Sequence, residues 1–226
     1  MPTGPLYCET GHALWFMAEP VNTVTNVFII VAGIYAWRAV NRARIGMPLD
    51  LAVLLVLLFA TGFGSFAWHA FRTRIALAFD ALPGLLFLFV FAGLWFRVLY
   101  GNIGGILGAL ALIALSALVP YWWWHGVQDV PRAWMFAPAF AVVAAIGLFL
   151  AAMTARRFGN RPARLGAFAI LGGVTAALCR SIDLLTCGVL PMGTHFLWHM
   201  LLSLAAYLGI VMLTELKPAE RREQGA

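Results

Sequence analysis

The sequence predicts an all-α membrane protein in which seven transmembrane helices form one bundle. Of its 226 residues, 63% are hydrophobic and only 11% are charged. Apolar runs of about 20 residues recur along the chain, and each is long enough to cross the roughly 30 Å hydrocarbon core as a helix. A backbone that crosses lipid must satisfy its own hydrogen bonds, so helices are expected throughout. The net charge of +6 is interpreted through topology rather than as a sign of nucleic-acid binding.

The predicted spans follow one another with short connections. Residues 1–21 are polar at intervals and lack a basic start followed by an apolar core, so no cleaved signal peptide is expected. Residues 215–226 are charged and are expected to form a solvated, frayed end. We find no internal repeat and no linker, so residues 1–226 are expected to form one domain. The predicted helices cover residues 22–41, 50–71, 77–97, 101–120, 133–155, 165–187 and 194–214.

Basic residues predict the orientation of the bundle. They are concentrated in loops on one side of the membrane, and the N-terminal segment on the other side has none. Because cytoplasmic loops carry the excess of Lys and Arg, the N-terminus is expected outside and the C-terminus in the cytoplasm. The preference for arginine over lysine favours a bacterial source. The protein would then lie in the inner membrane, with the active site expected at its periplasmic end. The richer side carries Arg38, Arg42, Arg44, Arg97, Arg156, Arg157, Arg161, Arg164, Lys217, Arg221 and Arg222, and the poorer side Arg72, Arg74 and Arg132.

His195 and His199 are the strongest candidates for chemistry. They lie four residues apart at the start of the last span, so their imidazoles share a helix face and can hold one metal ion. The alternative is a pair of interfacial or core histidines with ordinary hydrogen-bond partners. Ionisable groups inside membranes are costly and usually functional, and the predicted topology places His69 at a similar depth. Three imidazoles leave a fourth position open, as in catalytic zinc sites.

Asp80 and Ser65 are expected near these histidines. Asp80 lies about one turn into the third span, where a carboxylate is costly unless it is paired or near a cation. Ser65 shares a helix face with His69. Beside a zinc ion, Asp80 would act as a general base, and Ser65 would hydrogen-bond the water or the developing oxyanion. The alternatives are a carboxylate favoured by the helix macrodipole and a packing seam of small residues.

The cysteines and one charged pair complete the set of candidates. Cys8 and Cys187 would both face an oxidising compartment, so a disulfide between them is expected to tie the N-terminal segment over the outer mouth. Cys179 lies inside a predicted helix and is expected to be a free, buried thiol. Arg180 and Asp183 are three residues apart, and an ion pair that fixes helix packing is favoured over a catalytic role.

Taken together, these residues resemble the alkaline ceramidase family, part of a superfamily of seven-helix membrane hydrolases that includes the adiponectin and progestin receptors. The resemblance implies a zinc amidohydrolase that cleaves the amide of ceramide or a related N-acyl lipid, releasing a fatty acid and a sphingoid base or amine. It implies zinc ligands at His69, His195 and His199, with Ser65 and Asp80 around the activated water. It also implies a disulfide between Cys8 and Cys187. The matching stretches are residues 8–9, 19–26, 64–69, 80–83, 183–187 and 195–199.

The family's calcium site is only partly matched. Glu9 and Glu19 correspond to two of its members, but Leu6 stands where the family has an aspartate and Gly11 where it has an asparagine. We therefore expect at most weak calcium binding. Ala81 replaces the acidic residue that usually follows Asp80, which indicates a site adapted to a different lipid substrate.

Two other functions stay open from the sequence. The bundle could be a lipid receptor or sensor whose metal is structural, as the receptor branch of the superfamily illustrates. A haem protein is the other alternative, although two histidines four apart on one helix are a poor arrangement for the axial ligands of one haem. In each reading the expected partner is a membrane lipid or cofactor, not a nucleic acid.

Overall fold

The computed structural model describes residues 6–126 and 134–223, and this part of the chain is helical without a β-strand. Six helical stretches, with α1 and α2 counted together, are long and apolar enough to cross a membrane. This is the pattern of a multi-pass membrane protein. The helices are α1 (Pro20–Thr25), α2 (Val27–Arg42), α3 (Leu49–Phe71), α4 (Arg74–Gly126), α5 (Ala137–Phe158), α6 (Asn160–Thr186) and α7 (His195–Glu223).

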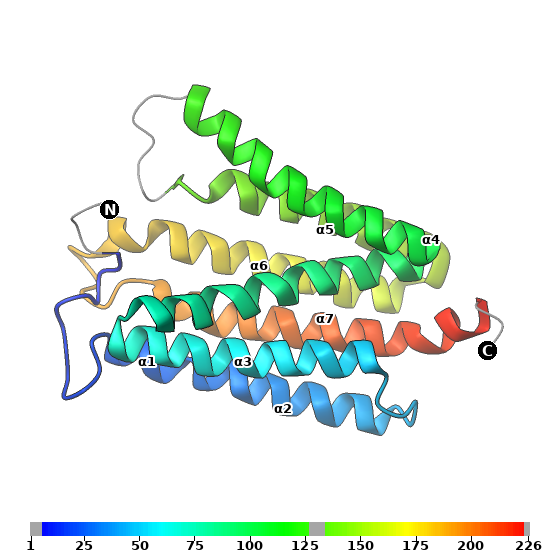
Figure 1. Ribbon diagram of the computed structural model, residues 1–226, viewed down its shortest axis with the longest axis horizontal. Coiled ribbons are helices and arrows are strands. Elements are labelled where there is room, and N and C mark those ends of the chain that lie inside the picture. Colours follow the sequence, from blue (N-terminus) through cyan, green and yellow to red (C-terminus); the bar gives the residue numbers. More distant parts are fainter. Residues whose placement is uncertain (1–5, 127–133, 224–226) are drawn as a thin grey trace.

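Helix α4 contains two of the predicted spans. Its backbone leaves helical geometry at Gly101, where φ is 75°, a conformation that glycine adopts without a side-chain clash. The second limb then folds back on the first. The two limbs pack so closely that a Cβ added at Gly105 would lie only 2.9 Å from the backbone oxygen of Gly93. Figure 1 shows the two limbs of α4 running in opposite directions. The third span was expected to end at Arg97, but the helix continues to Gly101 because no chain-breaking residue intervenes.

Local signals also explain other helix boundaries. Pro20 begins α1, where its missing N–H is not needed. Arg72 adopts a left-handed conformation with φ of 54° and ends α3. Gly159, with φ of 87°, separates α5 from α6, so α6 begins at Asn160 rather than at the predicted residue 165. The predicted start of the fifth span, residue 133, lies outside the described residues, and α5 begins at Ala137.

Helix α7 lies at the centre of the bundle and packs against α1, α2, α3, α4 and α6. The apolar core sits mainly between α7, α3 and the first limb of α4, with Leu54, Trp95 and Ile210 almost fully buried. The indole Nε1 of Trp95 donates a hydrogen bond of 2.8 Å to Thr154 Oγ1, which attaches α5 to this core. In lipid, such close packing and hydrogen bonding hold helices together without a hydrophobic drive from water.

The charged C-terminal segment is not the frayed end predicted for residues 215–226, at least as far as Glu223, where α7 ends. Lys217 and Glu220 are each only 5% exposed. Lys217 and Arg97 both contact Asp50, and Glu220 lies 2.7 Å from each of these two cations. Opposite charges from α3, α4 and α7 neutralise one another here, which allows a charged sequence to remain packed.

Candidate metal centre

Three histidines from two helices meet at one end of the bundle. His69 lies in the last turn of α3, and His195 and His199 lie in the first two turns of α7. None is more than 2% exposed. One nitrogen from each histidine lies within 4.8 Å of those of the other two, a spacing that allows all three to face a single ion. The convergence expected from the sequence is therefore present in the fold.

The buried histidine nitrogens fit a metal ion. His195 Nδ1 and His199 Nε2 have no hydrogen-bond partner among the described residues, and a buried polar atom left in this state costs free energy. The other nitrogen of His199, Nδ1, lies 3.0 Å from Thr25 Oγ1. Three imidazoles are a donor set suited to zinc, copper, iron or nickel. The residues thus form a group that can bind a transition metal.

Glu19 holds the third histidine. Its Oε2 atom lies 2.6 Å from His69 Nδ1, and its Oε1 atom lies 3.1 Å from the Arg72 guanidinium. Burial raises the pKa of the Glu19 carboxyl above its usual value, although Arg72 and hydrogen bonds from Asn22 and Thr10 act in the opposite direction. A carboxylate at Nδ1 fixes the orientation of the His69 ring and leaves its Nε2 atom to face a metal.

Glu9 contacts the start of a helix, whereas Glu19 contacts a histidine of the triad. Its buried carboxylate accepts hydrogen bonds from the backbone N–H groups of Val21 at 2.5 Å and Asn22 at 2.8 Å. Backbone N–H groups in the first turn of a helix have no partner within the helix, so Glu9 caps α1 from the preceding segment. Burial also raises the pKa of Glu9. Calcium binding by Glu9 and Glu19 stays a prediction, and an ion there would have to share carboxylates that already have protein partners.

Ser65 and Asp80 lie beside the histidines. Ser65 is one turn before His69 on α3 and is 3% exposed, and its side chain is close enough to that of the half-buried Asp80 on α4 to interact with it. The two helices approach closely at Gly64, where an added Cβ would collide with the backbone oxygen of Phe79. Only a residue without a side chain permits this approach. Gly64 therefore brings Asp80 within reach of Ser65.

The disulfide expected between Cys8 and Cys187 is present. It joins the N-terminal segment to the residue that follows α6. Cys179 is free, as expected, but half-buried rather than fully buried. The covalent link therefore brings the N-terminal segment to the same end of the bundle as the histidines.

Asp183 reinforces this link, and it does not form the ion pair predicted with Arg180. Its carboxylate accepts hydrogen bonds from the backbone N–H groups of Cys8 at 2.9 Å, Thr194 at 2.7 Å and His195 at 2.8 Å. Because these donors already occupy both oxygens, Asp183 fixes the start of α7. Within the described residues, Arg180 contacts aromatic rings instead.

Tyr7 is a residue of the site that the sequence analysis missed. Its ring stacks on His195 with the centroids 3.9 Å apart and lies 5.4 Å from the ring of His69. The Arg72 guanidinium lies 5.4 Å from the Tyr7 centroid. Nothing in the local pattern distinguishes this tyrosine, but it precedes Cys8, whose disulfide partner lies shortly before His195 in the sequence. That adjacency was the available signal.

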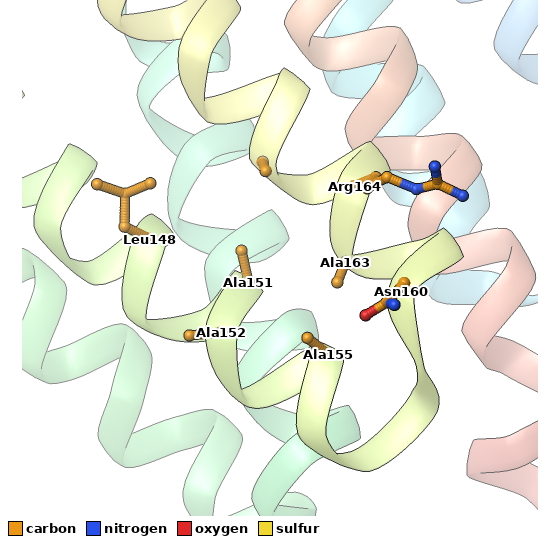
Figure 2. A pocket seen from close by; sticks show the side chains of 8 residues that line it. Leu148, Ala151, Ala152, Ala155, Asn160, Ala163 and Arg164 are labelled. Carbon is orange, nitrogen blue, oxygen red and sulfur yellow. The ribbon is translucent and has the colours of Figure 1, made fainter.

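An open groove of about 490 Å³ lies elsewhere, between α5 and the beginning of α6. Figure 2 shows alanine side chains from both helices along it, with Asn160 and Arg164 on the α6 side. No histidine or carboxylate lines this groove, so it lacks the groups that hydrolysis needs. Its lining residues are Leu148, Ala151, Ala152, Ala155, Asn160, Ala163, Arg164 and Ala167.

Comparison with protein families identifies the family to which this chain is similar. The model of the ceramidase family aligns with residues 6–226, a range that includes every residue of the candidate metal centre. Comparison with curated proteins gives no match. Because the family model covers nearly the whole chain, the chain belongs to the ceramidase family.

Proposed function

We propose that this protein is a zinc-dependent hydrolase that cleaves the amide bond of ceramide or a related N-acyl lipid. The products would be a fatty acid and a sphingoid base or other amine. Membership of the ceramidase family supports this assignment. The observation that carries it is the buried histidine triad with the Ser65–Asp80 pair one helical turn away. A lipid receptor with a structural metal does not require such a pair, so the arrangement favours an enzyme.

His69, His195 and His199 would hold the zinc ion. When bound, zinc supplies Lewis acidity toward the amide carbonyl and makes water a nucleophile near neutral pH. Asp80 is the proposed general base, which takes a proton from water and passes it to the leaving amine. Ser65 would donate a hydrogen bond to the oxyanion that develops on the carbonyl oxygen. Glu19 would keep the His69 ring in its binding orientation.

We further propose that seven helical segments cross the membrane, with α4 contributing one on each side of Gly101. The N-terminus would lie outside and the C-terminus in the cytoplasm, as the distribution of basic residues favours. In Figure 1 the N-terminal segment, the start of α4 and the start of α7 share one end of the bundle. A lipid would then enter from the bilayer with its amide at the outer end. In a bacterium this end would face the periplasm, where a disulfide is stable.

The test measures metal content and fatty-acid release on the purified, full-length protein. His199→Ala is expected to lose zinc and hydrolysis together, because two imidazoles remain of the three that hold the ion. Asp80→Asn should keep its zinc and lose activity by about 10²- to 10⁴-fold, as expected for a missing general base. His125→Ala changes an exposed histidine at the end of α4 and should alter neither quantity. A His199→Ala protein with full zinc content and full activity would overturn the assignment.

A further inference from the structure

Arg180 is a cation at the candidate site without an acidic partner in the described part of the chain. Arg72, the other cation there, is paired with Glu19 at 3.1 Å. The nearest acidic residue along α6, Asp183, is occupied by three backbone N–H donors. Asp80 attracts Arg180 electrostatically, but the two groups form no direct ion pair in the described residues. The hydrogen-bond donors of the Arg180 guanidinium are therefore left without a carboxylate partner in the described part of the chain.

The contacts of Arg180 place it beside the start of α7. Its guanidinium carbon lies 4.6 Å from the ring centroid of Phe136 and 5.8 Å from that of Trp198. Trp198 immediately precedes the triad residue His199. In addition, Thr194 Oγ1 donates a hydrogen bond of 2.6 Å to the backbone oxygen of Cys179. This hydrogen bond links the turn of α6 that carries Arg180 to the residue immediately before α7.

The charge of Arg180 acts on the interior of the site. It interacts electrostatically with Tyr7 and Asp80 and with the three histidines. These groups lie in the N-terminal segment and in helices α3, α4 and α7. The guanidinium therefore lies near enough to the triad and to Asp80 for its charge to act on them.

A guanidinium within a membrane helix is costly unless its charge is compensated. Two aromatic rings compensate part of that cost through cation–π contacts, but they leave the planar edge of the group available for hydrogen bonds. That edge carries donors whose geometry matches the two oxygens of a carboxylate. An aromatic support behind an unpaired guanidinium is an arrangement suited to binding an anionic ligand.

We propose that Arg180 binds a carboxylate carried by the lipid ligand. This proposal rests on the proposed function, because hydrolysis of a neutral amide leaves a carboxylate on the acyl chain beside the metal centre. The carboxylate has two possible sources. One is the acyl product itself, and the other is an acidic group on the amine half of the substrate, as in an N-acyl amino acid. In both cases Arg180 is a residue that determines ligand specificity.

The first experiment needs no turnover. Equilibrium binding of hexadecanoate and of hexadecanol is measured on the purified protein at alkaline pH, where the acid is ionised. The two ligands share a tail, so the ratio of their affinities isolates the carboxylate. Arg180→Gln should lower the preference for the acid by about 10- to 100-fold, the effect of a lost hydrogen bond to a charged group. Arg180→Lys should retain part of it.

Arg164→Gln is the matched control, because it removes an exposed arginine from the other end of α6 and should leave the ratio unchanged. Unaltered zinc content in Arg180→Gln establishes that the fold is intact. An unchanged ratio in that variant would overturn the proposal. So would a wild-type protein that binds acid and alcohol equally, a result that does not depend on the variant being isolated.

The second experiment separates the two sources. Hydrolysis of N-hexadecanoyl glycine is compared with that of N-hexadecanoyl ethanolamine, with hexadecanoate added as an inhibitor. A KM raised only for the glycine conjugate in Arg180→Gln would identify an acidic substrate, and weaker inhibition with both KM values unchanged would identify the product. No acid-specific change in either comparison would contradict the proposal. If neither these amides nor ceramide is hydrolysed, the proposed function fails, while the binding comparison still decides the role of Arg180.

Discussion

His69 is oriented by a carboxylate that lies 50 positions earlier in the chain, at 2.6 Å. Such partners of metal-binding histidines set the ring orientation and raise the basicity of the ligating nitrogen. We therefore expect Glu19→Gln to weaken zinc binding by about 10- to 100-fold while the triad itself is retained. Competition with a zinc chelator on the purified protein measures this change.

Glu9→Gln is the matched control for that variant. It alters a buried carboxylate in the same segment that caps α1 and contacts no histidine of the triad. It should reduce thermal stability but leave zinc affinity unchanged. Equal zinc affinities for Glu19→Gln and the wild-type protein would show that the contact with His69 does not support metal binding.

Single residues also show where sequence reasoning stops. The spacing of His195 and His199 predicts a shared helix face because it is a local property of the helix. The contact between Glu19 and His69, and the stacking of Tyr7 on His195, depend on how distant segments pack. The ion pair expected between Arg180 and Asp183 was wrong because backbone donors outside α6 compete for the carboxylate.

At the scale of elements, the N-terminal segment is tied to the end of α6 by the Cys8–Cys187 disulfide. The tie places Tyr7 against His195. Changing both cysteines to serine is expected to lower the free energy of unfolding by about 2–4 kcal/mol, and to weaken zinc binding because Tyr7 is released. Thermal unfolding in detergent and chelator competition would measure the two effects.

Cys179→Ser is the control for the disulfide variant, because Cys179 is a free thiol in α6, the helix that Cys187 follows. It should unfold at the wild-type temperature. If the double cysteine variant also matches the wild-type protein in stability and zinc affinity, the N-terminal segment does not depend on the disulfide for its position.

The boundaries of the elements were predictable where one residue sets the backbone. Gly101 and Gly159 interrupt the helices at positive φ, and hydropathy places the spans around them. The packed end of α7 was not predictable, because Lys217 and Glu220 look like solvent-exposed residues in the sequence. Their partners Asp50 and Arg97 come from other helices, and only the assembled bundle brings these charges together.

At the scale of the whole molecule, a helical membrane bundle follows from composition and apolar run length, since lipid leaves few alternatives to helices. The arrangement around α7 adds what hydropathy does not contain. It gathers the end of α3, the start of α4, the end of α6 and the N-terminal segment around the first turns of one central helix. A hydrolytic site can form there because polar groups are concentrated at one end of an otherwise apolar bundle.

The proposed function depends most on a single metal ion held by His69, His195 and His199. X-ray absorption spectroscopy of the purified protein loaded with one equivalent of zinc tests this directly. We expect three imidazole nitrogens at about 2.0–2.1 Å and one oxygen ligand in the fourth position. A spectrum without imidazole scattering, or a protein that retains no zinc at that stoichiometry, would contradict the account.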